Sequence, residues 1–165
     1  MGQTPDAATL LDLTQDKVAV IDDRGMYRYL NAAVSDLLGY DPDELVGTEA
    51  FDRLHPDDEA RLRARFERIV AGDPPPTEPI EYQYATADGD WLWLQSELHP
   101  PEHTDIDGYV LSSRDVTAEV ESIRRLETIV SKSPDVLWMF DADWSELLFV
   151  NESVEAGFGI PPAEL

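Results

Sequence analysis

Residues 17–31, KVAVIDDRGMYRYLN, have the pattern of a β-hairpin. Lys17–Asp22 is a largely apolar run, Asp23–Gly25 has the chemistry of a tight turn, and Met26–Leu30 alternates like a second strand. Asn31 is a residue type that caps helices, so a helix is predicted from Asn31 through Leu38. The domain is therefore expected to open with two antiparallel strands and a short helix.

Two further helix starts follow this hairpin. Asp41–Glu44 combines a cap, a proline at the first helical position and early acids, and Gly47 is expected to end the helix. Pro56–Glu59 opens a longer helix, which Gly72 ends. Apolar residues at positions i, i+4 and i+7 give the longer helix one buried face, formed by Leu62, Phe66 and Ile69.

Three strand patterns occupy the next part of the chain. Residues 80–84 alternate between aliphatic or aromatic and polar types, Asp88-Gly89 forms a tight turn, and residues 91–96 alternate again. Residues 108–114 form the last strand. The order β-β-α-α-α-β-β-β predicts an α+β domain with an antiparallel sheet and helices on one face.

The composition is strongly acidic, with 12 basic and 35 acidic residues and a net charge of −23. Charge of this size, spread along the whole chain, is expected of a cytoplasmic protein from a halophilic organism, where salt screens the repulsion. The alternative is a local acidic interaction surface. Either case disfavours nucleic acid as a partner.

The chain has no cysteine, which excludes disulfides and a cysteinyl flavin adduct. It also has no apolar run of membrane-spanning length, so no direct membrane contact is expected.

A helical connector is predicted at residues 118–132. Val116, Ile123 and Val130 lie seven residues apart, with Leu126 between the last two, as in a coiled coil. Glu119 interrupts this seam, so a helix that packs on its own domain is the alternative.

The end of the chain repeats its beginning. Asn31 matches Asn151 and Gly39 matches Gly159, both at an offset of 120 residues. Pro42 and Glu44-Leu45 match Pro162 and Glu164-Leu165 at the same offset. We therefore expect a lead-in at residues 1–13, a domain at 14–117, the connector at 118–132 and a truncated second repeat at 133–165, within a longer tandem array.

An ordered set of short motifs resembles the PAS family of sensory domains, in the subgroup with a helix after His-Pro-Asp-Asp. These motifs are Asp23-Arg-Gly25, Tyr29-Leu-Asn31, Leu38-Gly-Tyr40, Glu44-Leu-Val-Gly47, His55-Pro-Asp-Asp58, Glu81-Tyr82, Asp88-Gly89 with Trp93, and Asp115-Val-Thr117. The resemblance implies a PAS fold with a five-stranded antiparallel sheet, a cleft between sheet and helices, and a helix that passes signals onward. It also implies a haloarchaeal multi-PAS sensor histidine kinase or transducer-like protein as the parent.

The resemblance implies a pocket for an unknown small molecule, or a core that binds none. The pocket candidates are Val20, Tyr29, Leu37, Phe66, Tyr82 and Trp93. If the strand register places the alternating aromatics together, one face of the sheet is unusually aromatic. That face would then be a cofactor pocket, a packed core or a surface that meets a partner. Asp115 and Thr117 are expected to form the junction with the connector, where either residue could cap the helix.

No motif for catalysis is present, so this segment is predicted not to be an enzyme. His55 precedes a proline at a helix start and is expected to be a cap. His99 and His103 lie in a proline-containing loop, and the helix at 59–71 has no histidine. We therefore expect no haem, no flavin adduct and no metal site.

The sequence thus predicts a sensory module that binds a small ligand or a partner and relays the change through its connector. The alternative is a ligand-free dimerisation or spacer domain. Its expected partners are neighbouring domains of the same chain and a second copy, which would pair through the sheet face or the connector helix.

Overall fold

The protein is described by a computed structural model that covers residues 14–161. The predicted lead-in at 1–13 lies outside the described residues, as do Pro162, Glu164 and Leu165 of the predicted repeat. The chain divides into two compact units between Thr117 and Ala118, and each unit is described by itself.

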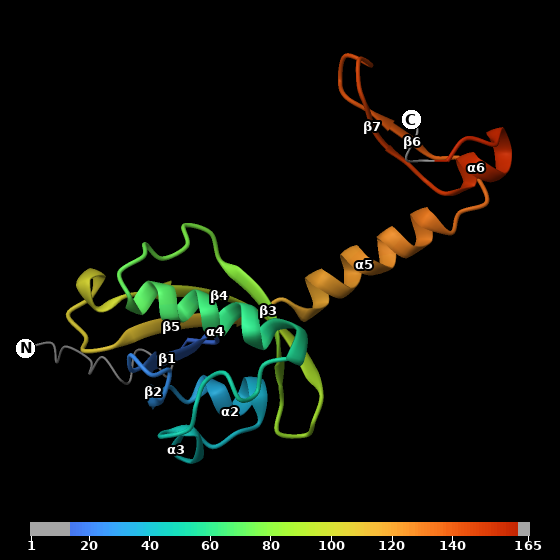
Figure 1. The fold of residues 1–165 in the computed structure, drawn as a ribbon. Helices are drawn as coiled ribbons and strands as arrows, with labels where there is room; N and C mark the ends of the chain where they lie inside the picture. Colours follow the sequence, from blue (N-terminus) through green and yellow to red (C-terminus); the bar gives the residue numbers. More distant parts are fainter. Residues whose placement is uncertain (1–13, 162–165) are drawn as a thin grey trace, which may run out of the picture. The chain divides into compact units, whose positions relative to one another are not determined.

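The first unit is built on one five-stranded antiparallel sheet with the strand order β2-β1-β5-β4-β3 (Figure 1). The first and last strands in the sequence, β1 and β5, pair at its centre. The sheet confirms the predicted α+β fold. The strands are β1 (Lys17–Ile21), β2 (Tyr27–Leu30), β3 (Ile80–Ala85), β4 (Trp91–His99) and β5 (Tyr109–Asp115), with a 3-10 turn η1 (Pro101–His103) before β5.

Alternation along the strands gives the sheet two different faces. One face, here called the inner face, carries fully buried side chains such as Ala19, Tyr84 and Leu94. Val20 and Trp93 point to the opposite, outer face, because each is adjacent in its strand to an inner residue. Across the inner face, Lys17 on β1 lies opposite Ser113 on β5. Ser113 in turn lies opposite Ser96 on β4, so three polar residues form one row across three strands.

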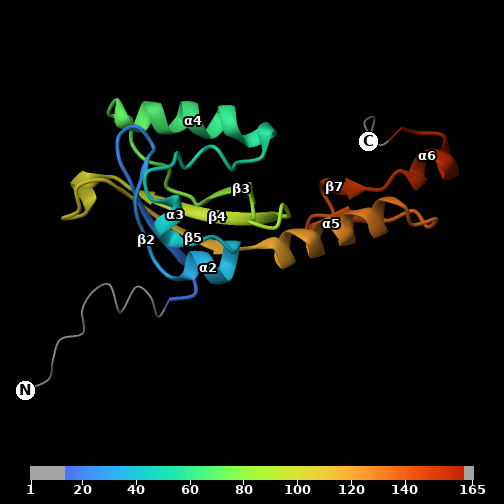
Figure 2. The same ribbon diagram turned by 90° about the horizontal axis from the view of Figure 1, so that it is seen from below.

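Three helices, α2 (Ala33–Leu38), α3 (Pro42–Leu45) and α4 (Pro56–Val70), pack against the inner face. In Figure 2, α4 forms a separate layer alongside the strands. Its buried residues are the predicted set, Leu62, Phe66 and Ile69. The predicted caps are confirmed for two helices: Asp41 accepts the N–H of Asp43 at the start of α3, and His55 Nδ1 accepts the N–H of Asp57 at the start of α4.

The predicted cap at Asn31 is wrong. The helix α2 begins at Ala33, and its capping position is Ala32, which makes no side-chain capping bond. Asn31 is 1% exposed and serves the sheet instead. Its Oδ1 accepts the N–H of Val18 at 2.9 Å, and its Nδ2 donates to the carbonyl of Asp16 at 3.0 Å. The Asn31 side chain therefore binds the backbone at the start of β1. These partners are too distant in the sequence for the local pattern around Asn31 to reveal them.

The second unit contains most of helix α5 (Thr117–Ser131), the hairpin β6 (Trp138–Phe140) and β7 (Leu147–Val150), and helix α6 (Ser153–Phe158). Asn151 repeats the bonds of Asn31: its Oδ1 accepts from Leu137 N at 2.9 Å, and its Nδ2 donates to Asp135 O at 2.9 Å. Val154 is fully buried. Many large apolar side chains of this unit remain exposed, among them Trp138, Met139, Trp144, Leu148 and Phe158.

None of the helices within residues 14–161 combines the length and the apolar character needed to span a bilayer.

Candidate functional site

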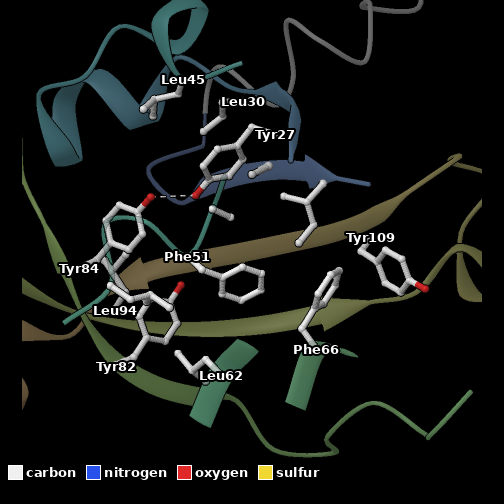
Figure 3. Close-up of a cluster of buried hydrophobic side chains, with 14 of the residues drawn as sticks. Tyr27, Leu30, Leu45, Phe51, Leu62, Phe66, Tyr82, Tyr84, Leu94 and Tyr109 are labelled. Carbon is white, nitrogen blue, oxygen red and sulfur yellow. Dashed lines mark hydrogen bonds between the residues drawn. The ribbon is translucent and has the colours of Figure 1, made fainter. Parts of the chain in front are cut away.

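A small cavity of about 80 Å³ lies in the core of the first unit, between the inner face of the sheet and α4. Figure 3 shows the aromatic cluster around it, in which the ring of Phe51 lies between the tyrosines and Phe66. The centroids of the Phe51 and Phe66 rings are 5.5 Å apart. The lining residues are Lys17, Ile21, Tyr27, Ala50, Phe51, Leu54, Leu62, Arg65, Phe66, Ile69, Pro76, Ile80, Tyr82, Tyr84, Ser96, Leu98 and Leu111. The cavity is therefore mostly apolar.

The polar row across the inner face supplies hydroxyl groups to this cavity. Ser96 Oγ donates to Ser113 Oγ at 2.7 Å, and the Tyr82 hydroxyl lies 2.7 Å from Ser96 Oγ. All three residues are buried. Buried hydroxyl groups need partners, and these three satisfy one another in a chain.

Lys17 lies at the other end of the row and is 1% exposed. Its Nζ donates to the Tyr27 hydroxyl at 3.1 Å, and it lies 5.3 Å and 4.9 Å from the ring centroids of Tyr27 and Tyr84. The two tyrosine hydroxyls are 3.1 Å apart and face each other in Figure 3. Burial raises the pKa of Tyr27 and of Tyr84, so both phenols stay protonated, and one of them donates to the other.

The lining of the cavity differs in charge from the rest of the chain. It includes two basic residues, Lys17 and Arg65, and no Asp or Glu. The whole sequence has 35 acidic and 12 basic residues. The cavity lining thus has two basic residues, the buried Lys17 and the half-buried Arg65, in a protein that is strongly negative as a whole.

The structure separates the six pocket candidates. Phe66 and Tyr82 line the cavity. Val20, Tyr29 and Trp93 lie on the outer face, as the pairings of Val20 with Tyr29 and of Trp93 with Gln83 show. Leu37 lies on α2 and packs against the core outside the lining.

The strand aromatics divide between the two faces instead of gathering on one. Tyr27, Tyr82 and Tyr84 are buried inside. Trp91 and Trp93 are on β4, where the even-numbered Leu94 and Ser96 face inward. Tyr29 joins them outside. Sequence reasoning also missed Lys17, although a lysine at the head of an apolar strand, in a chain with only two lysines, was a usable signal.

The junction residues tie the start of α5 to β4. Thr117 is the first residue of α5, and Asp115 Oδ1 accepts its N–H at 2.8 Å. Thr117 Oγ1 accepts the N–H of Trp93 at 2.9 Å, and Val116 N donates to the Trp93 carbonyl at 2.8 Å. Of the two capping alternatives, the geometry favours Asp115, because the Thr117 hydroxyl is engaged by the strand.

His55 and His99 make contacts within the first unit. His55 caps α4 and packs edge-on against Trp91, with ring centroids 4.8 Å apart. His99 Nε2 lies 3.7 Å from a carboxylate oxygen of Glu97 at the surface. Within residues 14–161, no three His, Asp or Glu side chains form a group that could hold a metal ion.

Two family models match the sequence. The sequence model described as the PAS fold matches residues 11–121, well over half of the chain, and a model described as the PAS domain matches residues 124–165. The structure resembles the PAS domain of an HTR-like protein from Haloarcula marismortui, with a TM-score of 0.54 and 20% identity over 66% of this chain and 92% of that one.

Two further relatives are a domain of a sensor histidine kinase and a nuclear translocator homolog. A domain of a sensory box sensor histidine kinase/response regulator from Geobacter sulfurreducens has a TM-score of 0.54 and 25% identity over 65% of this chain and 89% of that chain. The aryl hydrocarbon receptor nuclear translocator homolog of Drosophila melanogaster is 23% identical over 75 residues, which are 46% of this chain but only 12% of that protein. From the matching family model and the five-stranded antiparallel sheet, the chain belongs to the PAS family.

Proposed function

We propose that the first unit is a sensory module that binds a small molecule in the cavity and relays the change through α5. The PAS domain is itself non-catalytic, so binding and relay are the proposed roles. One observation supports the relay: strand β4 contacts both the cavity and the start of α5. Ser96 and Leu98 of β4 line the cavity, and Trp93 of the same strand holds Val116 and Thr117 where α5 begins.

A ligand would act by changing the packing of the inner face. Interiors are close-packed, so a molecule larger than this cavity displaces the side chains around it. A shift of β4 changes the position of the Trp93 N–H and carbonyl groups, and the first turn of α5 follows because it is bonded to both. The ligand would then favour one of two packings of the junction.

The proposed partner is a second copy of the chain, paired through α5 or through the outer face of the sheet. Ile123, Leu126 and Ile129 of α5 are more than half exposed, which is unusual for large apolar side chains on one helix. Val116 is already buried in the first unit, so pairing would use the later part of the helix. Neighbouring domains of a longer, cytoplasmic sensor kinase or transducer-like protein, from a halophile, would receive the signal.

A retained ligand tests the proposal directly. The protein is purified under native conditions, its absorption spectrum is recorded, and the denatured protein is analysed by mass spectrometry for a released small molecule. We expect a released molecule without a visible absorption band. A haem or flavin band would overturn the expected ligand class.

The second candidate function is a ligand-free dimerisation or spacer domain. The size of the cavity favours it, because about 80 Å³ is well below the ~300–1,000 Å³ of ordinary ligand pockets. A protein that releases no molecule, and whose melting temperature no small molecule changes, would establish this function instead.

A further inference from the structure

Lys17 is a buried lysine that contacts two tyrosine rings and one hydroxyl. Its ammonium group is buried, yet among residues 14–161 no Asp or Glu forms an ion pair with it. Buried charges in proteins are normally paired, because removing an ion from water is unfavourable without a counter-charge. The tyrosine rings and one hydroxyl compensate Lys17 only in part, since an ammonium has three N–H donors and Tyr27 takes one.

We propose that the cavity binds a small organic anion, a short-chain monocarboxylate, with Lys17 as its counter-ion. The inference rests on the proposed ligand-binding function and names the class of ligand. Lys17 lines the cavity, so a carboxylate there could accept hydrogen bonds from the ammonium group. The hydroxyl groups of Tyr82 and Ser96 also line the cavity, on the two strands beyond Ser113 in the sheet.

The rest of the lining suits a short apolar tail. Phe51, Leu54, Leu62, Phe66 and Ile69 surround the space beyond the polar row. A volume of about 80 Å³ is roughly half that of an engineered cavity that holds benzene, which leaves room for about three or four non-hydrogen atoms. Acetate has four non-hydrogen atoms and is of this size, whereas propionate, with five, and longer chains require the cavity to widen.

Charge selects for an anion at this position. The lining has Lys17 and Arg65 without an acidic residue. Arg65, Pro76 and Ile80 line both this cavity and a surface depression that also contains Arg61, Glu78 and Glu81. The protein repels anions from most of its surface, but an anion that passes Arg65 reaches a site where its charge is compensated.

The test compares matched ligands that differ in charge. The whole chain is titrated separately with potassium propionate, propionamide and potassium chloride. Potassium sulfate keeps the ionic strength constant. Binding is measured by the change in melting temperature and by calorimetry. We expect propionate to bind and propionamide to bind at least about tenfold more weakly, as expected for loss of a charged hydrogen bond. Equal binding of both, or binding of propionamide alone, would overturn the anion inference while the ligand-binding function stands.

Two other outcomes are equally decisive. An effect of chloride equal to that of propionate would mean that the site takes an inorganic ion, which overturns the carboxylate assignment. No binding of propionate, propionamide or acetate, together with no molecule released from the native protein, would overturn both the inference and the proposed function.

Variants locate the site. Lys17→Met keeps a long side chain and removes the charge, so propionate affinity should fall at least about tenfold. The control is Lys132→Met, which changes the other lysine, an exposed residue, by the same substitution and should leave the affinity unchanged. If Lys17→Met does not fold, propionate affinity is measured in Tyr27→Phe instead. This variant keeps the ring and removes the hydroxyl that Lys17 contacts. Unchanged propionate affinity in a folded Lys17→Met variant would refute the assignment.

Discussion

Thr117→Val should weaken the junction between the sheet and α5 without removing side-chain volume. Thr117 Oγ1 accepts the Trp93 N–H at 2.9 Å in a partly buried position, and valine has no acceptor. Loss of one such bond costs about 1 kcal/mol of the free energy of unfolding. For a domain of this size, that corresponds to a melting temperature lower by about 4–8 °C. The same loss should raise hydrogen exchange at the Trp93 amide about fivefold.

The assay is thermal unfolding combined with hydrogen exchange resolved to single residues. Thr117→Ser keeps the Oγ acceptor and should resemble the unmodified protein in both measurements. Thr128→Val is a second control, because the Thr128 hydroxyl is exposed and bonds only to the Arg124 carbonyl within α5. In a longer sensor of the kind proposed above, Thr117→Val and Asp115→Ala should reduce the coupling of input to output while the domain stays folded. If Thr117→Val and Thr117→Ser gave the same melting temperature and the same exchange at Trp93, the proposed role of this bond would be refuted.

Three further predictions concern charge and association. The net charge of −23 should make the melting temperature rise between dilute and molar potassium chloride, because the screening length falls from about 10 Å at 0.1 M to about 3 Å at 1 M; a salt-independent melt would contradict the halophile proposal. Burial would raise the pKa of Asp22, but backbone N–H groups, including that of Met26, and the Arg28 guanidinium outweigh it and hold this pKa below its ordinary value. The stabilisation is therefore present above about pH 4 and lost as the pH falls through the folded pKa, so Asp22→Asn should flatten the acid limb of unfolding free energy against pH. Replacing both Ile123 and Leu126 with Ser should shift the sedimentation coefficient toward that of the monomer if α5 pairs. An unchanged distribution of sedimentation coefficients would leave only the sheet face as the interface.

Elements set by a few neighbouring residues could be predicted from the sequence. The caps at Asp41 and His55 depend on a backbone N–H two residues away, so the local pattern contains all the information. The buried stripe of α4 follows from its helical period. Asn31 failed as a cap because its partner, Val18, is thirteen residues distant in the hairpin.

The candidate pocket was predicted less well, for a geometric reason. Alternation shows that neighbouring residues in a strand face opposite ways, but it does not say which of them faces the helices. Tyr82 and Trp93 were both candidates, and the pairing of β3 with β4 puts them on opposite faces. A register shift between Val20 and Ile21 further changes the parity between β1 and β2.

The order of the elements and the α+β class follow from the sequence, because capping, turn chemistry and periodicity act over a few residues. The ordered set of short motifs carries the family resemblance. Which side chains meet depends on the pairing of the strands. Lys17, Ser96 and Ser113 are distant in the chain, and the pairing of β1, β5 and β4 places them in one buried row. That row, with the acid-free cavity beside it, exists because strand register joins residues whose separation in sequence carries no periodic signal.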